Sequence, residues 1–488
     1  MRGAPIVTAK EMARIERKSI EEGADDEAYM DKAGEEIARL VQEEFAPRKV
    51  LLLLGKGNNG GDALVAGLHL HNAGVEVTAY HLYPPEEYSP LCKKKGEAFY
   101  NAKGPFLPIE KTTIFPSDCV ILDGLLGTGF SGKTEGLLAE TIEKVNASGA
   151  PIVALDIPSG VDGNTGAVEG SAIQATMTIT LGMAKLGLFV GEGYNHIGEL
   201  RIVDFGLDPK YQKEAELQGY LLDEKKLFEI VPKPKRTRHK YEAGYLLAVA
   251  GSPGMPGAAL LACTAALRTG VGIVRLYHMP KMEEELAAAP YELIRSDHFE
   301  ELFTEVKRAN ALVIGPGMGR DEEAKKRFVR LLDVPLPRVI DADGLFHLSE
   351  IKNFQAKVPT VLTPHKKEME RLLGAEPTHA ACQKYAEDKE VVLIVKGAPT
   401  WIFSPGKSPF ISTRGCPGMA TAGTGDVLTG IIGSFLAQKL DALPAALLGV
   451  TLHGVSGEIA AKKLSNEAMI ASDLIENIST FFKINFFS

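Results

Sequence analysis

Short apolar runs, each ending in polar or glycine-rich residues, recur along the whole chain. They cover residues 49–54, 119–123, 152–156, 312–314, 339–340, 361–362 and 391–395. Continuous apolar runs of this length are typical of strands buried on both faces of a parallel sheet. Longer apolar stretches at 63–72 and 427–436 predict helices. The pattern therefore predicts an α/β fold, whose ligands collect beyond the carboxyl ends of the strands.

The length of the chain and one irregular segment predict at least two domains. A chain of 488 residues exceeds what one hydrophobic core normally serves. Residues 206–238 combine proline and charge with little periodicity, which indicates a linker beginning near 206. We therefore expect domains at 1–222 and 223–488. The basic residues 233–238 could bind nucleic acid, but the prolines and the net charge of −9 favour a solvated linker.

Cysteine usage and hydropathy predict a cytoplasmic protein with no nucleic-acid or membrane partner. The five cysteines lie far apart, without metal-ligand spacing or an even disulfide set, which indicates a reducing compartment. No long apolar run follows the start of the chain, and we find no stretch of 18 or more apolar residues.

The stretch at residues 421–428 carries the most informative chemistry. Gly423 and Gly425 let backbone N–H groups approach an anion, and the apolar run that follows predicts a helix whose N-terminus favours negative charge. Asp426 is then placed to take a proton from a substrate hydroxyl beside a phosphate. In the alternative interpretation, Asp426 is only the N-cap of this helix.

The second half of the chain resembles a known family through several motifs in order. These are the Gly-Pro-Gly-Met-Gly turn at 315–319, Asp-Ala-Asp at 341–343, Thr-Pro-His at 363–365, Lys-Gly-Ala at 396–398 and Gly-Thr-Gly-Asp at 423–426. From about residue 225 to the end, the chain is similar to the ribokinase-like, ADP- or ATP-dependent NAD(P)H-hydrate dehydratases. It departs from the family at Phe346, where asparagine is common, and at Lys366 and Lys367.

The resemblance implies a catalytic base, a substrate site and a nucleotide site. Asp426 would be the base, and the substrate would contact Ala258, Gly317, His365 and Asp426. The adenine nucleotide, ADP or ATP with Mg²⁺, would contact Lys396, Gly397, Ala398, Pro399, Thr400 and Gly425.

The first half has its own strand, glycine loop and helix, at residues 49–54, 55–62 and 63–72. This order is that of a Rossmann-type phosphate site, although the glycine spacing differs from the usual dinucleotide fingerprint. Two later strands end in Asp123 and Asp156 at the same predicted edge. Together with Asn59 and Ser159, Asp123 would supply hard oxygen ligands, which suit an alkali or alkaline-earth cation.

These motifs resemble the NAD(P)H-hydrate epimerase family over residues 1 to about 210. The resemblance implies that K⁺ is bound by Asn59, Asp123 and Ser159, and that Asp156 is catalytic and faces the reacting ring. The hydrated nucleotide would contact Asn58, Asn59, Gly60, Gly61, Asp62, Gly127, Thr128, Gly129, Phe130, Ser131, Gly132, Lys133 and Asp156. Ala63 replaces a common glycine.

A rival interpretation comes from residues 127–134, which satisfy the P-loop pattern Gly-x-x-x-x-Gly-Lys-Thr. A nucleotidase or GTPase would then be expected. Gly136 counts against it, because glycine in the helix that should start there costs about 1 kcal/mol relative to alanine.

Together the two resemblances predict a Rossmann-like N-terminal domain and a ribokinase-like C-terminal domain. They imply metabolite repair: epimerisation of hydrated NADH or NADPH, then nucleotide-dependent dehydration of the S form, by a homo-oligomer. The alternatives are a small-molecule kinase of the same fold and a ligand-binding scaffold with degenerate sites.

Overall fold

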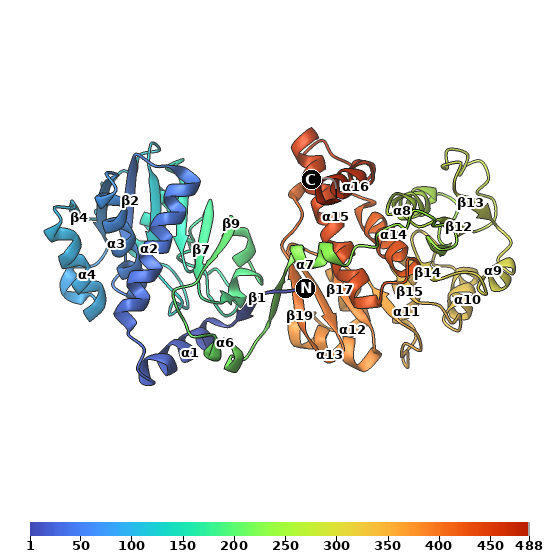
Figure 1. Ribbon diagram of the computed structural model, residues 1–488, viewed down its shortest axis with the longest axis horizontal. Helices are drawn as coiled ribbons and strands as arrows, with labels where there is room; N and C mark the ends of the chain where they lie inside the picture. Colours follow the sequence, from blue (N-terminus) through green and yellow to red (C-terminus); the bar gives the residue numbers. More distant parts are fainter. Residues whose placement is uncertain (487–488) are drawn as a thin grey trace. The chain divides into compact units, whose positions relative to one another are not determined.

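The computed structural model describes residues 1–486, which divide into two compact units. One unit comprises Ala4–Gly219, and the other comprises Met1–Gly3 together with the chain from Tyr220 onward. Figure 1 marks the N-terminus beside α7 (Glu224–Glu229), an element of the second unit. Nothing in the sequence had indicated that the first three residues belong to the second unit.

The N-terminal unit is built on a seven-stranded sheet in the order β4-β3-β2-β5-β6-β7-β9, and all its neighbouring strands are parallel. The strands are β2 (Lys49–Leu54), β3 (Glu76–His81), β4 (Phe106–Pro108), β5 (Val120–Gly124), β6 (Ile152–Leu155), β7 (Met177–Leu181) and β9 (Glu199–Val203). The end of β1 (Arg2–Val7) pairs separately with β8 (Ala184–Lys185). The parallel strands expected at 49–54, 119–123 and 152–156 are confirmed.

Helices cover both faces of this sheet. They are α1 (Ala9–Glu21), α2 (Asp26–Phe45), α3 (Asn58–Asn72), α4 (Pro90–Asn101), α5 (Gly136–Asn146) and α6 (Pro209–Glu214). On β2, Val50, Leu52 and Leu54 join a core with residues of α2 and α3, whereas Leu51 and Leu53 join a second core with residues of α5. The continuous apolar run of β2 is therefore explained by burial on both faces.

The C-terminal unit contains a larger sheet in the order β13-β12-β11-β14-β15-β16-β17-β18-β19-β10. Its strands are β10 (Gly219–Leu222), β11 (Tyr245–Val249), β12 (Ile273–Tyr277), β13 (Ile294–Ser296), β14 (Ala311–Ile314), β15 (Arg338–Ile340), β16 (Thr360–Leu362), β17 (Val392–Val395), β18 (Thr400–Ser404) and β19 (Lys407–Ser412). The four strands predicted between 312 and 395 are parallel neighbours, as expected. Only β18 pairs antiparallel, with β17 and β19.

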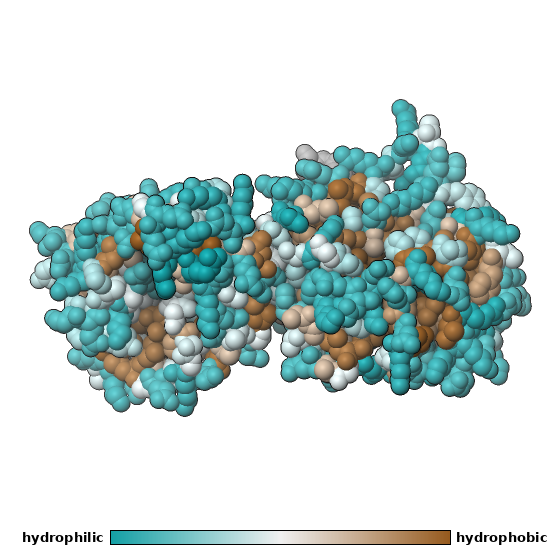
Figure 2. Space-filling model, turned by 90° about the horizontal axis from the view of Figure 1, so that it is seen from below, coloured by the Kyte–Doolittle hydropathy of each residue, from teal (hydrophilic) through white to brown (hydrophobic). Residues whose placement is uncertain are grey.

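Apolar helices fill the core on one face of this sheet. The helices of the unit are α7, α8 (Pro256–Arg268), α9 (Glu301–Glu305), α10 (Glu322–Leu331), α11 (Asp343–Ser349), α12 (Lys366–Leu373), α13 (His379–Lys389), α14 (Thr424–Ala437), α15 (Ala442–Leu464) and α16 (Ala471–Phe486). Residues of α8, α14, α15 and α16 share one core with β11. Among the described residues, only α15 is long and apolar enough to cross a membrane, and 72% of its most apolar window is buried, as in a core helix. Hydrophilic residues cover most of the face in Figure 2.

Residues 206–238 differ from the linker expected there. They contain α6, β10 and α7, and β10 pairs in parallel with β19. Tyr211 and Leu227 are buried. Proline and charge misled the prediction because Pro209 stands at the start of a helix, where a missing N–H costs nothing.

Candidate functional site

In the C-terminal unit, the Gly-Thr-Gly-Asp motif forms the first turn of α14. Gly423 is the N-cap, with φ of 92°, and a Cβ there would lie 2.4 Å from Leu261 Cδ1. The positive φ favours glycine here, and Leu261 would have to move to admit a larger side chain. Asp426 is the third residue of the helix, so the alternative that made it the N-cap is wrong. Amides of the first turn have no partner within a helix and favour an anion.

A buried histidine supports this turn from α15. The ring Nε2 of His453 lies 2.8 Å from the Thr424 carbonyl oxygen. Burial lowers the pKa of His453 to about 4, so the ring is neutral and its Nε2–H donates to that carbonyl. His453 thus fixes the start of α14 without adding charge to the site.

Asp426 has the protonation behaviour expected of a general base near neutral pH. Burial, followed by the nearby carboxylate of Asp341, raises its pKa to about 7, and the Lys396 ammonium opposes this shift. A base is most effective when its pKa is close to the working pH. Asp426 can therefore exchange a proton with a substrate under physiological conditions.

Lys396 directly follows β17, and its ammonium group acts electrostatically on Asp426. Its Nζ donates to Asp341 Oδ1 at 2.8 Å, while Thr429 Oγ1 donates to Asp341 Oδ2 at 2.7 Å. Burial alone would lower the pKa of Lys396, but Asp341 raises it, so the ammonium form is retained. A Cβ on Gly425 would lie 3.3 Å from Lys396 Nζ. The structure thus brings together two of the residues expected at the nucleotide site, beside the N-terminus of α14.

The other predicted contacts of this unit lie at the ends of neighbouring elements. His365 is the N-cap of α12 and forms a parallel bridge with Lys396. Gly317 has φ of 58°, and a Cβ there would lie 3.1 Å from that of Ala258 on α8. Residues 397–400 lead into β18, and Thr400 Oγ1 donates to the Gly397 carbonyl at 2.9 Å. Close contacts among these residues thus join His365 with Lys396, Ala258 with Gly317 and Thr400 with Gly397.

In the N-terminal unit, the proposed cation ligands converge at the ends of β5 and β6. Ser159 donates its Oγ to Asp123 Oδ1 at 2.6 Å and its backbone N–H to Asp123 Oδ2 at 2.8 Å. Asn59 Nδ2 donates to the Leu126 carbonyl at 2.7 Å, and the Leu126 N–H donates to Ser159 Oγ at 2.8 Å. Asp123 is fully buried, and burial raises its pKa to about 6.

One buried atom at this point fits a bound cation. Asn59 Oδ1 is buried and has no hydrogen-bond partner within the described part of the chain. A buried acceptor without a partner costs about 1–3 kcal/mol, and a cation would remove that cost. With Asp123 and Ser159 it forms a set of oxygen donors, which a hard cation prefers to zinc or copper.

The segment at residues 58–62, expected to be a loop, is instead the first turn of α3. Gly57 is its N-cap, and Asn59 to Asp62 are buried. Their amides therefore lie at a helix N-terminus, which suits an anionic nucleotide. Two glycines and two asparagines are weak helix formers, and this concealed the true start of the helix.

The glycine loop at residues 127–133 is mostly exposed and turns through a bond from Phe130 N to Gly127 O. The P-loop alternative is not supported by its geometry. Thr134 is buried and donates its hydroxyl to the Ser171 carbonyl at 2.7 Å, whereas Lys133 pairs with Glu135. In a P-loop the threonine hydroxyl binds Mg²⁺ and the lysine binds the phosphates. Neither side chain is free for that role here.

Sequence reasoning missed a lysine that contacts Asp156. Lys185, on β8, is fully buried, and its Nζ donates to Asp156 Oδ1 and to the Leu181 carbonyl, the latter at 2.7 Å. Asp156 has φ of 62° and accepts a further bond from the Leu181 N–H at 3.0 Å. Lys185 follows Asp156 by 29 residues and belongs to none of the motifs noted above. The signal available in the sequence was its place as the one charged residue in the apolar run 181–190.

Comparison with known proteins gives matches to both units. Residues 26–187 match the family model described as YjeF-related protein N-terminus, and residues 246–480 match that described as NAD(P)H-hydrate dehydratase. The bifunctional NAD(P)H-hydrate repair enzyme Nnr of Moorella thermoacetica is 36% identical, over 96% of this chain and 95% of the relative. The enzyme of the same name from Escherichia coli is 33% identical, over 92% and 88%.

A solved structure supports the fold of the C-terminal unit. A ribokinase-like superfamily protein of Enterococcus faecalis superposes with a TM-score of 0.51 and 27% identity, over 54% of this chain and 95% of that one. Both predicted halves are thus found in one chain, in the order of the full-length relatives. The chain belongs to the family of bifunctional NAD(P)H-hydrate repair enzymes.

Proposed function

We propose that the C-terminal unit dehydrates the S form of hydrated NADH or NADPH, with ADP or ATP as phosphoryl donor. The observation that carries this proposal is the position of Asp426, which has a pKa of about 7 at the N-terminus of α14, beside Lys396. The helix amides and the ammonium group favour the phosphates of the nucleotide. The carboxylate is then available to the substrate hydroxyl.

The proposed reaction has two stages. Asp426 takes the proton of the C6 hydroxyl, whose oxygen attacks the terminal phosphorus while the bond from phosphorus to the leaving nucleotide breaks. The ring nitrogen then supplies the electron pair that expels phosphate from C6, and loss of the C5 proton restores the dihydropyridine. The amides of Gly423, Thr424 and Gly425 stabilise the charge on the transferring group. Phosphorylation is needed because hydroxide is a poor leaving group.

The N-terminal unit is proposed to exchange the R and S epimers at C6, with Asp156 at the reacting ring. Asn59, Asp123 and Ser159 would hold K⁺, and the unpartnered Oδ1 of Asn59 supports this assignment. A bound cation supplies positive charge beside the phosphate-binding turn of α3.

Mg²⁺ is proposed to enter the C-terminal unit with the nucleotide. No group of three or more histidine, cysteine or acidic side chains that could hold a metal occurs in the described part of the chain. Mg²⁺ commonly uses one or two carboxylates together with substrate phosphates, so a preformed cage is not required. Cytoplasmic localisation and a homo-oligomeric state complete the proposal; the free cysteines agree with a reducing compartment.

The decisive experiment incubates the purified protein with an R and S mixture of hydrated NADH, with ADP, with ATP or without nucleotide. We expect full recovery of dihydronicotinamide absorbance only with nucleotide, and epimer exchange without it. A stable phosphorylated product would instead favour the kinase alternative.

The pH dependence of dehydration should report Asp426. The base is active when ionised, and its pKa is raised to about 7, so kcat/KM should fall as pH decreases through about 7. Well below that value the decrease should approach tenfold per pH unit. The measurement is kcat/KM for the S hydrate between pH 5.5 and 8.5 at saturating nucleotide. A flat profile over this range contradicts the assignment.

The cation site predicts a selective defect in Asp123→Ala. This variant should lose the dependence of epimer exchange on K⁺ and the stabilisation of the N-terminal unit by K⁺, because it removes the only charged ligand. Exchange rates and thermal melting are measured in KCl and in choline chloride. Asp118→Ala, at an exposed position before the same strand, is the control. Equal rates and melting of the unmodified protein in both salts would rule out a functional potassium site.

A further inference from the structure

Asp156 belongs to a buried cluster of charged groups from four elements of the N-terminal unit. The cluster comprises Asp156 after β6, Lys185 on β8, Glu16 on α1 and Asp62 on α3. Each carboxyl group of Glu16 and Asp62 is influenced electrostatically by Asp156 and Lys185. The cluster therefore holds three carboxyl groups and one ammonium group. If all four were ionised, the cluster would carry a net negative charge.

Lys185 forms an ion pair with Asp156. Its side chain is fully buried, whereas that of Asp156 is 14% exposed, so the aspartate alone of this pair reaches the surface. The Thr180 hydroxyl lies within 3.2 Å of both Lys185 Nζ and Asp156 Oδ1. The ammonium, the hydroxyl and the Leu181 N–H all converge on the same oxygen, Oδ1. Asp156 Oδ2 receives none of these bonds.

Burial raises the pKa of each of the other two carboxyl groups. Burial raises the pKa of Glu16 to about 7, with Lys185 opposing and Asp156 adding to the shift. The pKa of Asp62 is raised well above its usual value, mainly by burial and then by the negative charges of Asp156 and Glu16. The remaining titratable neighbour of Asp62 is Cys92 on α4, whose pKa is raised to about 12, so that it is a neutral thiol.

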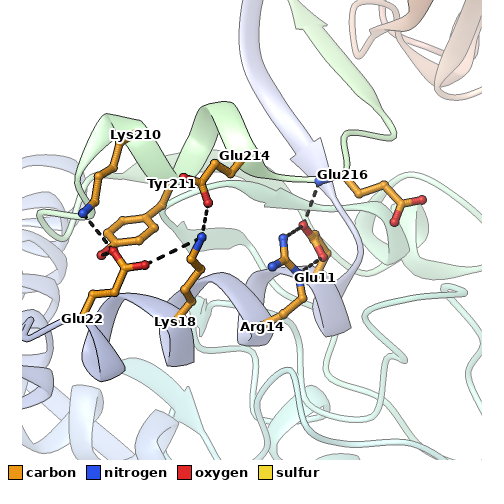
Figure 3. Close-up of polar contacts among 8 residues, drawn as sticks. All are labelled: Glu11, Arg14, Lys18, Glu22, Lys210, Tyr211, Glu214 and Glu216. Carbon is orange, nitrogen blue, oxygen red and sulfur yellow. Dashed lines mark hydrogen bonds and ion pairs between the residues drawn. The ribbon is translucent and has the colours of Figure 1, made fainter.

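A polar network fixes the helix that carries Glu16. Figure 3 shows polar contacts between α1 and the segment around α6. Glu22 accepts a hydrogen bond from the Tyr211 hydroxyl at 2.8 Å, and Glu11 accepts one from the Glu216 N–H at 2.8 Å. Lys18 adds an ion pair to Glu214. Glu11, Lys18 and Glu22 share the face of α1 that carries buried Ile15, so polar and apolar contacts act together on that face.

Epimer exchange at C6 needs a base that is ionised before the substrate arrives. The C6 hydroxyl proton passes to a carboxylate, the C6–N1 bond opens to an aldehyde with its electron pair on N1, and N1 takes a proton from water. Closure on the opposite face of the aldehyde reverses each transfer. A cation paired with a carboxylate favours its ionised form.

We propose that Lys185 is a positioning residue for epimer exchange, which holds Asp156 Oδ1 through its ion pair and leaves Oδ2 free for the substrate. This inference rests on the proposed epimerase function of the N-terminal unit. Lys185 is fully buried and belongs to none of the sequence motifs.

The test compares Lys185→Met, Lys185→Arg and Glu16→Gln in the full-length protein. Exchange between separated R and S hydrates is followed by chromatography without nucleotide, from pH 5 to 9. In Lys185→Met we expect kcat at pH 7 to fall about 100-fold, the magnitude typical of misplacing a reacting group by about 1 Å. The acid-side fall of its pH–rate profile should move to higher pH by at least about one unit. KM should change less than about threefold, because the lysine does not touch substrate. Lys185→Arg should keep the acid-side fall in its original place.

Controls separate this role from a structural one. Lys95→Met removes another largely buried lysine of the same unit, paired with Asp31 and Glu27, and should leave exchange unchanged. If Lys185→Met does not fold, Glu16→Gln remains informative, since removing a neighbouring acid should move the acid-side fall of the rate to lower pH. An unchanged pH profile in Lys185→Met, or in Glu16→Gln where the methionine variant does not fold, overturns the inference. Absence of exchange in the unmodified protein overturns the proposed function itself.

Discussion

Asp426→Asn should lower nucleotide-dependent dehydration by about 10²–10⁴-fold, the usual loss when a general base is removed. Asparagine has nearly the same shape but cannot accept the hydroxyl proton. It also removes a buried carboxylate next to Asp341, so we expect the variant to fold and to retain nucleotide affinity. The measurements are kcat for the S hydrate, the Kd of ADP or ATP and the melting temperature.

The N-terminal unit supplies an internal control for this variant. Epimer exchange should be unaffected, because Asp426 belongs to the C-terminal unit. Asp441→Asn, at an exposed position before α15, controls for the loss of one charge in the same unit. Near-normal dehydration by Asp426→Asn, with its product restored dihydronicotinamide, would refute the base assignment.

Lys396→Met should destabilise the C-terminal unit and weaken nucleotide use together. Asp341 is 1% exposed and would lose its charged partner, keeping only the Thr429 hydroxyl. Breaking a buried pair by removing one partner costs about 3–5 kcal/mol. We expect a loss of about 3 kcal/mol in the free energy of unfolding, and a rise of at least about tenfold in the KM of the nucleotide, as a charge-assisted phosphate contact is lost. Denaturant unfolding and steady-state kinetics measure these changes.

The double variant Asp341→Asn with Lys396→Met separates the two effects. Neutral asparagine no longer needs the ammonium, so most of the stability should return while nucleotide use stays impaired. Recovery of both would show that Lys396 is only structural. Lys384→Met is the matched control, since it breaks an exposed pair with Asp388 and should have little effect.

The strands and the edge of the sheet where the site lies could be predicted from sequence, because buried parallel strands are continuous apolar runs. Residues 49–54 form β2 with the predicted bounds, and the other runs differ from their strands by one residue or so. Convergence of Asp123 with Ser159, and of Lys396 with Gly425, follows from this topology. These pairs lie at the carboxyl ends of parallel strands or at the helix starts that follow them.

What could not be predicted depends on contacts between residues distant in the chain. Helix starts at Asn58 and Thr424 were placed several residues late, because glycine and asparagine conceal a helix whose stability comes from packing. Glu16 is an ordinary charged residue of an amphipathic helix until β8 is placed beside Asp156. Lys185 likewise gains meaning only from the fold. The segment at 206–238 lacked periodicity because its elements are too short to show any.

The assignment of Met1–Gly3 to the C-terminal unit means that the polypeptide passes between the units twice, at residues 3–4 and at 219–220. The Asp223 N–H donates to the Met1 carbonyl at 3.1 Å, and the Arg2 guanidinium lies 5.0 Å from the centre of the Tyr220 ring. A proteolytic nick after Gly219 would therefore leave the N-terminal fragment carrying a three-residue peptide ligand for the other fragment.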